Sequence, residues 1–191
     1  MLITFIGVPC SGKTSVASRL FADLKDHGLS VELLTEQARM YIAKKKYREK
    51  NGFTGLDTND QFTIMREQAI NELALAANSS SIVIADSCAL SALFYVPKSE
   101  ITQTAICLAR RMAPRYNLIF RCAAVVPGIN YDPLRIHSYE ESIALEPRID
   151  DVLALARVND DRIVRLYGDN NTRALDAIRI TTALIYEEFR R

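Results

Sequence analysis

The sequence carries little net charge and contains no long hydrophobic run. Its 24 Lys and Arg residues nearly balance its 23 Asp and Glu residues, which leaves a formal net charge of +1. Proteins dedicated to duplex DNA are usually far more basic, so extensive binding along a phosphate backbone is not expected. No apolar stretch approaches about 18 residues, the length that a membrane-spanning helix needs. We therefore expect no membrane partner.

The sequence also has no tryptophan and only four cysteines. Cys10, Cys88, Cys107 and Cys122 lie too far apart to form a CxxC pair, which excludes a zinc ribbon. The apolar segment Met1 to Gly7 lacks a preceding basic region and a following cleavage pattern, so we expect no signal peptide. Reduced thiols in a cytoplasmic protein are the expectation that follows.

The length and the hydrophobic pattern predict one α/β domain. A chain of 191 residues is the size of about one domain, which we expect to span residues 1–191. Short apolar runs alternate with stretches of helical periodicity, and no linker or repeat interrupts them. The runs predict five strands at residues 2–6, 31–35, 82–85, 118–120 and 163–167. This alternation favours a three-layer α/β/α fold with a five-stranded parallel sheet, and ligands are expected at the C-terminal ends of its strands.

The first strand is followed by a phosphate-binding motif. Residues 7–14 read Gly-Val-Pro-Cys-Ser-Gly-Lys-Thr and fit the pattern G-x-x-x-x-G-K-[ST]. In this motif the glycines let the backbone amides point at phosphate oxygens, and the helix that follows adds its N-terminal dipole. We expect Lys13 to reach the β- and γ-phosphates of ATP and the Thr14 hydroxyl to bind Mg²⁺. The nucleotide-binding residues predicted here are Gly7, Pro9, Cys10, Ser11, Gly12, Lys13 and Thr14.

Two features exclude a GTPase switch. The sequence has no Asn-Lys-x-Asp motif to recognise guanine. The third predicted strand ends in Asp86-Ser87-Cys88-Ala89, without the glycine that forms the usual switch hinge. The motif therefore leaves kinases and other ATP-dependent proteins open.

Glu36 and Asp86 are the predicted catalytic carboxylates, because each follows a strand that should end beside the phosphate loop. Phosphoryl transfer needs one carboxylate to hold Mg²⁺ and one to orient the acceptor hydroxyl or take its proton. We assign Asp86 to the metal and Glu36 to the acceptor, and the reverse assignment stays open. The alternative for Glu36 is a charge that stabilises a helix N-terminus, and the alternative for Asp86 is a helix cap.

A lid is expected at about residues 127–150, between the fourth strand and the last helices. Arg135 is the first candidate for a catalytic arginine and Arg148 is the second. Such arginines neutralise developing charge on the triphosphate when a lid closes and excludes water. The alternative is an ordinary surface arginine.

These residues together resemble P-loop kinases related to the nicotinamide riboside kinase domain of bacterial NAD-biosynthesis proteins, a group of AAA-type kinases with members in bacteriophages. Residues 35–41, Thr-Glu-Gln-Ala-Arg-Met-Tyr, are similar to that family's Glu-Tyr-Ala-Arg-Glu-Tyr segment. Residues 85–87 resemble its Asp-Thr, and residues 132–135 resemble its Asp-Gly-x-Arg lid. Met40, Pro133 and the missing tryptophan depart from the family pattern.

The resemblance implies an ATP- and Mg²⁺-dependent kinase that phosphorylates a hydroxyl or phosphate of a nucleoside, a nucleotide or a related small molecule. It further implies that Glu36, Arg39 and Gln68 bind this acceptor. Residues 44–50 contain five basic side chains and Tyr47, and a phosphorylated or polymeric acceptor could lie there. A kinase acting on hydroxymethylated pyrimidines in DNA and a non-catalytic ATP-binding regulatory module are the alternatives. The sequence leaves both a monomer and a homodimer open.

Cys10 is expected to be the most reactive of the thiols. It lies near a helix N-terminus and beside Lys13, where a thiolate is stabilised. The other three, Cys88, Cys107 and Cys122, sit in or beside apolar segments and are expected to face the core. The alternative is a packed, inert Cys10.

Overall fold

The computed structural model describes residues 1–78, 82–124 and 138–190. Its five strands form one parallel sheet in the order β2-β3-β1-β4-β5. Arg135 and the rest of the Asp132–Arg135 segment lie outside the described residues. The sequence placed all five strands correctly to within two residues at their ends: β1 (Leu2–Ile6), β2 (Val31–Leu34), β3 (Ile82–Ala85), β4 (Leu118–Cys122) and β5 (Ile163–Leu166).

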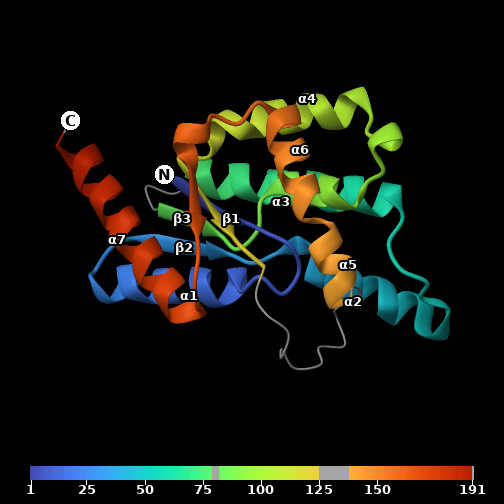
Figure 1. The fold of residues 1–191 in the computed structure, drawn as a ribbon, viewed down its shortest axis with the longest axis horizontal. Coiled ribbons are helices and arrows are strands. Elements are labelled where there is room, and N and C mark those ends of the chain that lie inside the picture. Colours follow the sequence, from blue (N-terminus) through green and yellow to red (C-terminus); the bar gives the residue numbers. More distant parts are fainter. Residues whose placement is uncertain (79–81, 125–137, 191) are drawn as a thin grey trace.

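Helices cover both faces of the sheet, so the predicted three-layer α/β/α fold is confirmed (Figure 1). On one face α1 and α7 pack against the sheet through side chains such as Leu20 and Ala177. On the other face lie α3, α4 and α6, which contribute Met65, Met112 and Val152 to a second core. The long helices are α1 (Lys13–Asp26), α2 (Gln37–Glu49), α3 (Thr58–Asn78), α4 (Gln103–Met112), α6 (Glu146–Ala156) and α7 (Asn170–Phe189).

The central strand β1 shows why the apolar runs are continuous rather than alternating. All five of its residues are buried. Successive side chains of a strand point to opposite faces of the sheet, so Leu2 and Ile6 enter one core while Ile3 and Phe5 enter the other. Phe5 stacks at a tilt on Phe120 of the neighbouring strand, with ring centroids 5.2 Å apart. A strand covered on both faces needs apolar residues at every position.

One buried element was missed by the sequence analysis. After β3 the chain forms a 3₁₀ helix, η2 (Ala89–Tyr95), which packs between α3 and α6. Its first six residues are all buried, so it has no amphipathic stripe for periodicity to detect. Farther along, the short helix α5 (Tyr139–Ala144) precedes α6, and Pro147 stands in the first turn of α6, where a residue without a backbone N–H costs no intrahelical hydrogen bond.

None of the helices within the described ranges is both long enough and apolar enough to cross a membrane.

Candidate active site

The loop between β1 and α1 has the backbone that the phosphate-binding motif predicts. A Cβ atom at Gly7 would lie 2.6 Å from the Cys122 carbonyl oxygen and 2.6 Å from Ser11 Oγ, so only glycine fits there. Gly12 has a φ of +81° and abuts the Asn170 side chain, which excludes any larger residue at the start of α1. The two glycines thus permit the tight curl that turns backbone amides toward one centre.

Lys13 lies folded over this loop. Its Nζ donates hydrogen bonds of 3.0 Å to the carbonyl oxygens of Gly7 and Val8. The side chain is 9% exposed, so its ammonium group is kept within the loop where phosphates would bind. A bound phosphate would compete for the same ammonium protons.

Thr14 and Asp86 meet at the open end of the loop. The Thr14 hydroxyl donates a 2.8 Å hydrogen bond to Asp86 Oδ2. Asp86 is 4% exposed, and its second oxygen, Oδ1, is buried without a hydrogen-bond partner among the described residues. Burial raises the pKa of Asp86, the Thr14 bond lowers it, and the negative charge of Glu36 raises it further. The net shift is upward despite the opposing charges of Lys13 and Arg39.

This donor set suits a magnesium ion. Mg²⁺ prefers oxygen ligands and keeps several waters, so one or two protein groups beside a phosphate are enough to hold it. The Thr14 hydroxyl and the unpartnered Asp86 Oδ1 provide such groups. No cluster of three or more His, Cys, Asp or Glu side chains suited to a metal occurs in the described part of the chain. The residues present therefore fit Mg²⁺ bound together with a nucleotide better than a protein-only metal centre.

The sheet brings Glu36 to the same place. Leu34 of β2 pairs with Ala85 of β3, and the Asp86 amide donates a 2.9 Å hydrogen bond to the Leu34 carbonyl oxygen. Both predicted carboxylates therefore follow the C-terminal ends of neighbouring strands, and Glu36 stands at the N-cap of α2. The Glu36 side chain makes no capping hydrogen bond, but its charge stands at the helix N-terminus where the dipole favours it, so the structural alternative for this residue stays open.

Gln68 lies between the segments that carry these two carboxylates. Its Oε1 accepts a 3.2 Å hydrogen bond from the Gln37 amide, and its Nε2 donates one of 2.8 Å to the Ser87 carbonyl oxygen. Nε2 also donates to Glu72 Oε1 at 2.9 Å. The side chain is 3% exposed. Gln68 was predicted to bind the acceptor, but in this structure both ends of its amide are bonded within the chain.

Glu72 is a buried carboxylate that the sequence analysis missed. It is fully buried, and it accepts hydrogen bonds from the Tyr116 hydroxyl at 2.7 Å and the Ala89 amide at 3.0 Å in addition to that from Gln68. Burial raises the pKa of Glu72 to about 7 despite these three donors. The helical periodicity of this segment was recognised from its apolar residues alone, so the polar Glu72 was not expected on the buried face of α3. A polar pair spaced by four residues, Gln68 and Glu72, was the available signal for a buried network.

A second set of missed residues comes from the start of α7. Arg173 is 2% exposed, and its Nη1 donates a 2.7 Å hydrogen bond to the Ser11 carbonyl oxygen. Asn170 contacts Gly12 in the same loop. These two residues support the phosphate loop from a distant part of the sequence, because Arg173 is 162 positions from Ser11. No local sequence pattern marks them for this role.

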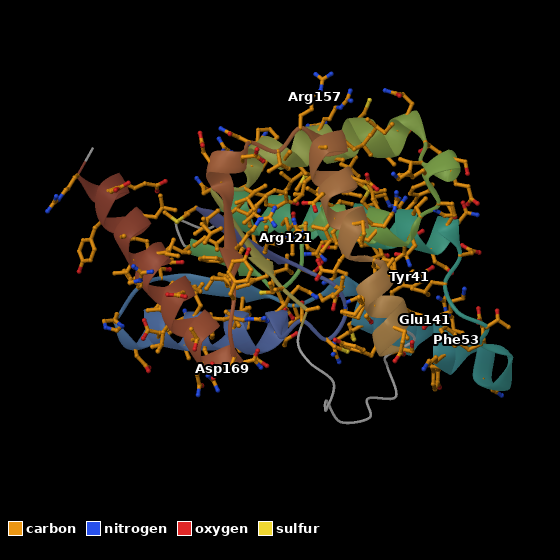
Figure 2. All side chains as sticks on the ribbon, viewed as in Figure 1. Tyr41, Phe53, Arg121, Glu141, Arg157 and Asp169 are labelled. Atoms are coloured by element: carbon orange, nitrogen blue, oxygen red, sulfur yellow. The ribbon has the colours of Figure 1, made fainter. Side chains whose placement is uncertain are left out.

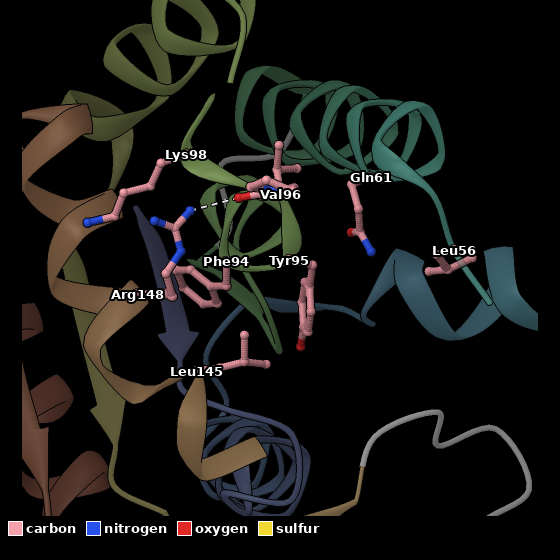
Figure 3. A pocket seen from close by; sticks show the side chains of 9 residues that line it. Leu56, Gln61, Phe94, Tyr95, Val96, Lys98, Leu145 and Arg148 are labelled. Atoms are coloured by element: carbon pink, nitrogen blue, oxygen red, sulfur yellow. Dashed lines mark hydrogen bonds between the residues drawn. The ribbon is translucent and has the colours of Figure 1, made fainter. Parts of the chain in front are cut away.

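A cavity of about 460 Å³ is lined by residues of α3, η2 and α6 and of the segments next to them (Figure 3). In Figure 3 the Tyr95 ring and the Gln61 amide point into it from η2 and α3, and Leu145 closes another side. Burial raises the pKa of Tyr95, and electrostatic interactions with Glu36 and Cys10 raise it further. Tyr95 is therefore the lining residue through which this cavity is coupled electrostatically to Glu36 and to Cys10 of the phosphate loop. Its lining is completed by Leu56, Phe94, Val96, Pro97, Lys98 and Arg148.

Arg148 lies at this cavity but is bonded to the protein. Its Nη2 donates hydrogen bonds to the carbonyl oxygens of Val96 at 2.8 Å and Leu93 at 3.4 Å, and its Nη1 pairs with Asp151 at 3.3 Å. These contacts tie α6 to η2. A role over the triphosphate would require Arg148 to exchange them.

The basic segment 44–50 is partly neutralised. Lys45 forms a 2.5 Å ion pair with Asp60, which also accepts a 2.7 Å hydrogen bond from the Tyr41 hydroxyl. Burial alone would raise the pKa of Asp60, but the bonds from Lys45, the Asp57 amide and Tyr41 lower it below its usual value. Tyr41 lies beside the start of α3, and Phe53 lies near the end of α2 (Figure 2). Lys45 of this segment is therefore already paired within the protein, which reduces the positive charge that the segment offers to a ligand.

The cysteines divide differently from the prediction. Cys88 and Cys122 are buried, and burial raises their pKa values to about 12 and about 11. Cys107, expected to face the core, is exposed. It lies on α4, whose buried residues Ala105, Ala109 and Met112 occupy another face of that helix. Cys10 is half-exposed and has a φ of +66°, a backbone conformation that favours glycine.

The parallel sheet, its flanking helices and this loop give the chain a P-loop fold, the architecture found in nucleoside and nucleotide kinases. Residues 2–162 match a family model described as an AAA domain, so the chain belongs to that AAA domain family. No curated protein sequence matches the chain significantly.

Solved structures with this fold include NadR proteins and a thymidylate kinase. The NadR protein in complex with NAD and AMP-PNP superposes with a TM-score of 0.66 at 22% identity, covering 93% of this chain and 47% of that one. The NadR protein in complex with NR gives a TM-score of 0.64 at 22% identity, with 93% and 49% covered. The chain thus spans about half the length of these NadR chains. Thymidylate kinase from Ehrlichia chaffeensis gives 0.62 at 18% identity, with 95% and 98% covered.

Proposed function

We propose that this protein is an ATP- and Mg²⁺-dependent kinase that transfers the γ-phosphoryl group to a nucleoside, a nucleotide or a related small molecule. The observation that carries the proposal is the Thr14–Asp86 hydrogen bond beside the phosphate loop, with Asp86 Oδ1 buried and without a hydrogen-bond partner among the residues that the structure describes. A nucleotide-binding loop alone would fit many ATPases. The addition of Glu36 and a cavity on the acceptor side is what favours phosphoryl transfer to a small molecule.

The residues of the loop would bind and orient the triphosphate. Backbone amides between Gly7 and Thr14 would bind its phosphate oxygens, and Lys13 would leave its two carbonyl partners for the β- and γ-phosphates. Thr14 and Asp86 would hold Mg²⁺, which neutralises charge on the phosphates when bound. Arg135, or Arg148 after releasing η2, would bind the transferred group and exclude water from it.

Glu36 would act on the acceptor. The oxygen of the acceptor hydroxyl attacks the γ-phosphorus, the bond from that phosphorus to the β-bridging oxygen breaks, and ADP leaves with the bond's electron pair. The hydroxyl proton passes to a Glu36 carboxylate oxygen. The positive charge of Arg39 lowers the pKa of Asp86. Arg39 would hold a polar group of the acceptor near Glu36 and Asp86. A phosphate acceptor is already ionised, so no proton transfer to Glu36 is needed. Arg39 would then bind the negative phosphate oxygens of the acceptor.

The cavity supports an acceptor with a flat ring. It offers the Tyr95 and Phe94 side chains for stacking or apolar contact and the Gln61 amide for hydrogen bonding. One structural neighbour is NadR in complex with NR and another is a thymidylate kinase, which agrees with this class. The DNA alternative has less support, because Lys45 of the basic segment is already paired with Asp60.

The experiment is phosphoryl transfer from γ-labelled ATP with Mg²⁺ to separate panels of nucleosides, nucleoside monophosphates and duplex DNA containing hydroxymethylated pyrimidines. Label in a nucleoside or a nucleotide, lost in Lys13→Ala, is the expected result. Label in DNA alone would replace the small-molecule acceptor by the DNA alternative. Tight ATP binding without transfer to any panel would favour the regulatory module and contradict a kinase.

A further inference from the structure

We propose that Gln68, held by Glu72, is a positioning residue that fixes the spacing between the two catalytic carboxylates, Glu36 and Asp86. This inference rests on the proposed kinase function and adds to it a structural cause for the carboxylate geometry. We refer to the side chains of Gln68 and Glu72 together as the carboxylate bracket.

The bracket bonds the chain immediately after each carboxylate. Gln37, whose amide donates to Gln68 Oε1 at 3.2 Å, directly follows Glu36. Ser87, whose carbonyl oxygen accepts from Gln68 Nε2 at 2.8 Å, directly follows Asp86. One side chain of α3 therefore joins the start of α2 to the segment that leaves β3.

The sheet itself does not provide this connection. The pairing of β2 with β3 ends at Leu34 and Ala85, and its last backbone bond runs from the Asp86 amide to the Leu34 carbonyl oxygen. Beyond that bond the segment after β2 continues into α2, and the segment after β3 continues into η2. Glu36 and Asp86 follow the ends of these paired strands, and two like charges brought to one place repel each other. A bond placed beyond the end of the ladder opposes that separation.

Glu72 determines which way the Gln68 amide points. Glu72 Oε1 accepts from Gln68 Nε2 at 2.9 Å and from the Ala89 amide at 3.0 Å, and Oε2 accepts from the Tyr116 hydroxyl at 2.7 Å. A flipped Gln68 amide would place its oxygen against both Glu72 and the Ser87 carbonyl oxygen, and its NH₂ group against the Gln37 amide. Gln68 is 3% exposed and Glu72 is 0% exposed, so water cannot replace the lost partners.

A small displacement of Glu36 and Asp86 should lower the rate of phosphoryl transfer more than it weakens the binding of ATP. Reacting groups need to be held within about 0.5 Å of their productive geometry, and a misplacement of about 1 Å can cost a hundredfold in rate. The phosphate loop does not depend on the bracket, because Arg173 and Asn170 of α7 contact that loop from the other face of the sheet. Loss of the bracket should therefore lower turnover while leaving ATP binding nearly intact.

The test replaces Gln68 by Met, which has a similar length and no hydrogen-bonding amide. Steady-state kinetics, normalised to the number of ATP-binding molecules, should show kcat reduced by about tenfold or more and the KM for ATP changed by less than about twofold. Asn71→Leu is the matched control, since it removes an amide from α3 three residues away, and its kcat should stay near that of the wild type. Glu72→Gln keeps the acceptor oxygen and should retain most of kcat, whereas Glu72→Met should not.

A double-mutant cycle separates positioning from a general loss of structure. If Gln68 acts through Glu36, Gln68→Met should lower kcat much less in a Glu36→Gln background than in the wild type. Equal effects in both backgrounds, or an unchanged kcat in Gln68→Met, would overturn the inference. Should Gln68→Met not fold, Gln68→Asn is one methylene too short to bond both segments and carries the same expectations.

A last measurement does not depend on catalysis. Hydrogen exchange of the Gln37 amide should accelerate in Gln68→Met and not in Asn71→Leu, because Gln68 Oε1 is the acceptor for that amide. If wild-type protein transfers no phosphate, the kinase proposal fails, and this exchange still decides the bracket. Unchanged exchange would contradict it.

Discussion

Thr14 and Asp86 are 72 positions apart in the sequence, yet the hydroxyl of one donates a 2.8 Å hydrogen bond to the carboxylate of the other. The contact joins the first turn of α1 to the end of β3, which is the strand next to β1 in the sheet. A threonine on the phosphate loop and a buried acid on the adjacent strand form the pair that can hold a nucleotide-bound cation. The predictions below test this pair and the groups around it.

Replacement of Asp86 by Asn should reduce kcat by at least about a hundredfold, which corresponds to roughly 2.7 kcal/mol of transition-state stabilisation. The physical reason is the loss of a negative oxygen ligand at the Mg²⁺ position. Titration of activity and of ATP affinity with Mg²⁺ measures the effect, and the stimulation by Mg²⁺ should weaken. Asp176→Asn, a surface change on α7, is the control. An Asp86→Asn protein with wild-type dependence on Mg²⁺ would contradict the metal assignment.

Replacement of Lys13 by Ala should abolish turnover and leave the protein folded. Lys13 makes hydrogen bonds only to loop carbonyls in the described part of the structure, so its removal costs about 1–2 kcal/mol of stability at most. Circular dichroism and isothermal titration with ATP provide the measurements. Lys25→Ala on the exposed face of the same helix should keep full activity. Full activity in Lys13→Ala would refute the kinase proposal.

Replacement of Arg135 by Ala should lower kcat more than it raises the KM for ATP, because a lid arginine acts on charge that develops in the transition state. Arg148→Ala should have a smaller effect on kcat and a clearer one on thermal stability, since Arg148 bonds the carbonyl oxygens of Leu93 and Val96. Steady-state kinetics and thermal melts distinguish the two. A kcat within about twofold of wild type would remove Arg135 from the catalytic set.

Glu72 should make stability depend on pH. Its pKa is raised from 4.5 in the unfolded chain to about 7 in the folded protein. Below about pH 4.5 the group is protonated in both states, and as the pH rises through 7 the folded state must hold a buried charge. The loss of stability over this window is roughly 3 kcal/mol.

Denaturant unfolding between pH 4.5 and 8 measures this effect as a difference between wild type and Glu72→Gln. The variant should gain stability relative to wild type as the pH rises, because its amide carries no charge. Glu67→Gln, on the same helix, corrects for a general change in charge. Parallel stability curves for wild type and Glu72→Gln would show that Glu72 does not titrate in this range.

Alkylation should distinguish Cys10 from Cys107. Cys107 is exposed and Cys10 is partly buried, whereas Cys88 and Cys122 are buried with raised pKa values. In a Cys107→Ser background, peptide mapping should find the label at Cys10, and MgATP should slow the reaction because the nucleotide covers the loop. In the wild type, MgATP should leave labelling of Cys107 unchanged. Labelling of Cys10 that ignores MgATP would contradict the loop geometry.

The sequence by itself determined the β1–loop–α1 unit, the five strands and the positions of Glu36 and Asp86 at strand ends. These features are local: strands buried on both faces need continuous apolar runs, and the loop needs glycine at two fixed positions, Gly7 and Gly12. Neither requirement depends on which distant segments become neighbours. Pattern and spacing were therefore sufficient.

Only the tertiary structure decided which side chains support the site. Gln68 was predicted to bind the acceptor, and nothing in its local sequence indicated that its amide would bond Gln37 and Ser87. The roles of Glu72 and Arg173 depend on partners far away in the chain, and a polar residue on an otherwise apolar helix face has no single local meaning. A buried hydrogen bond exists only when folding places both partners within about 3 Å, and that distance is set by packing rather than by sequence spacing.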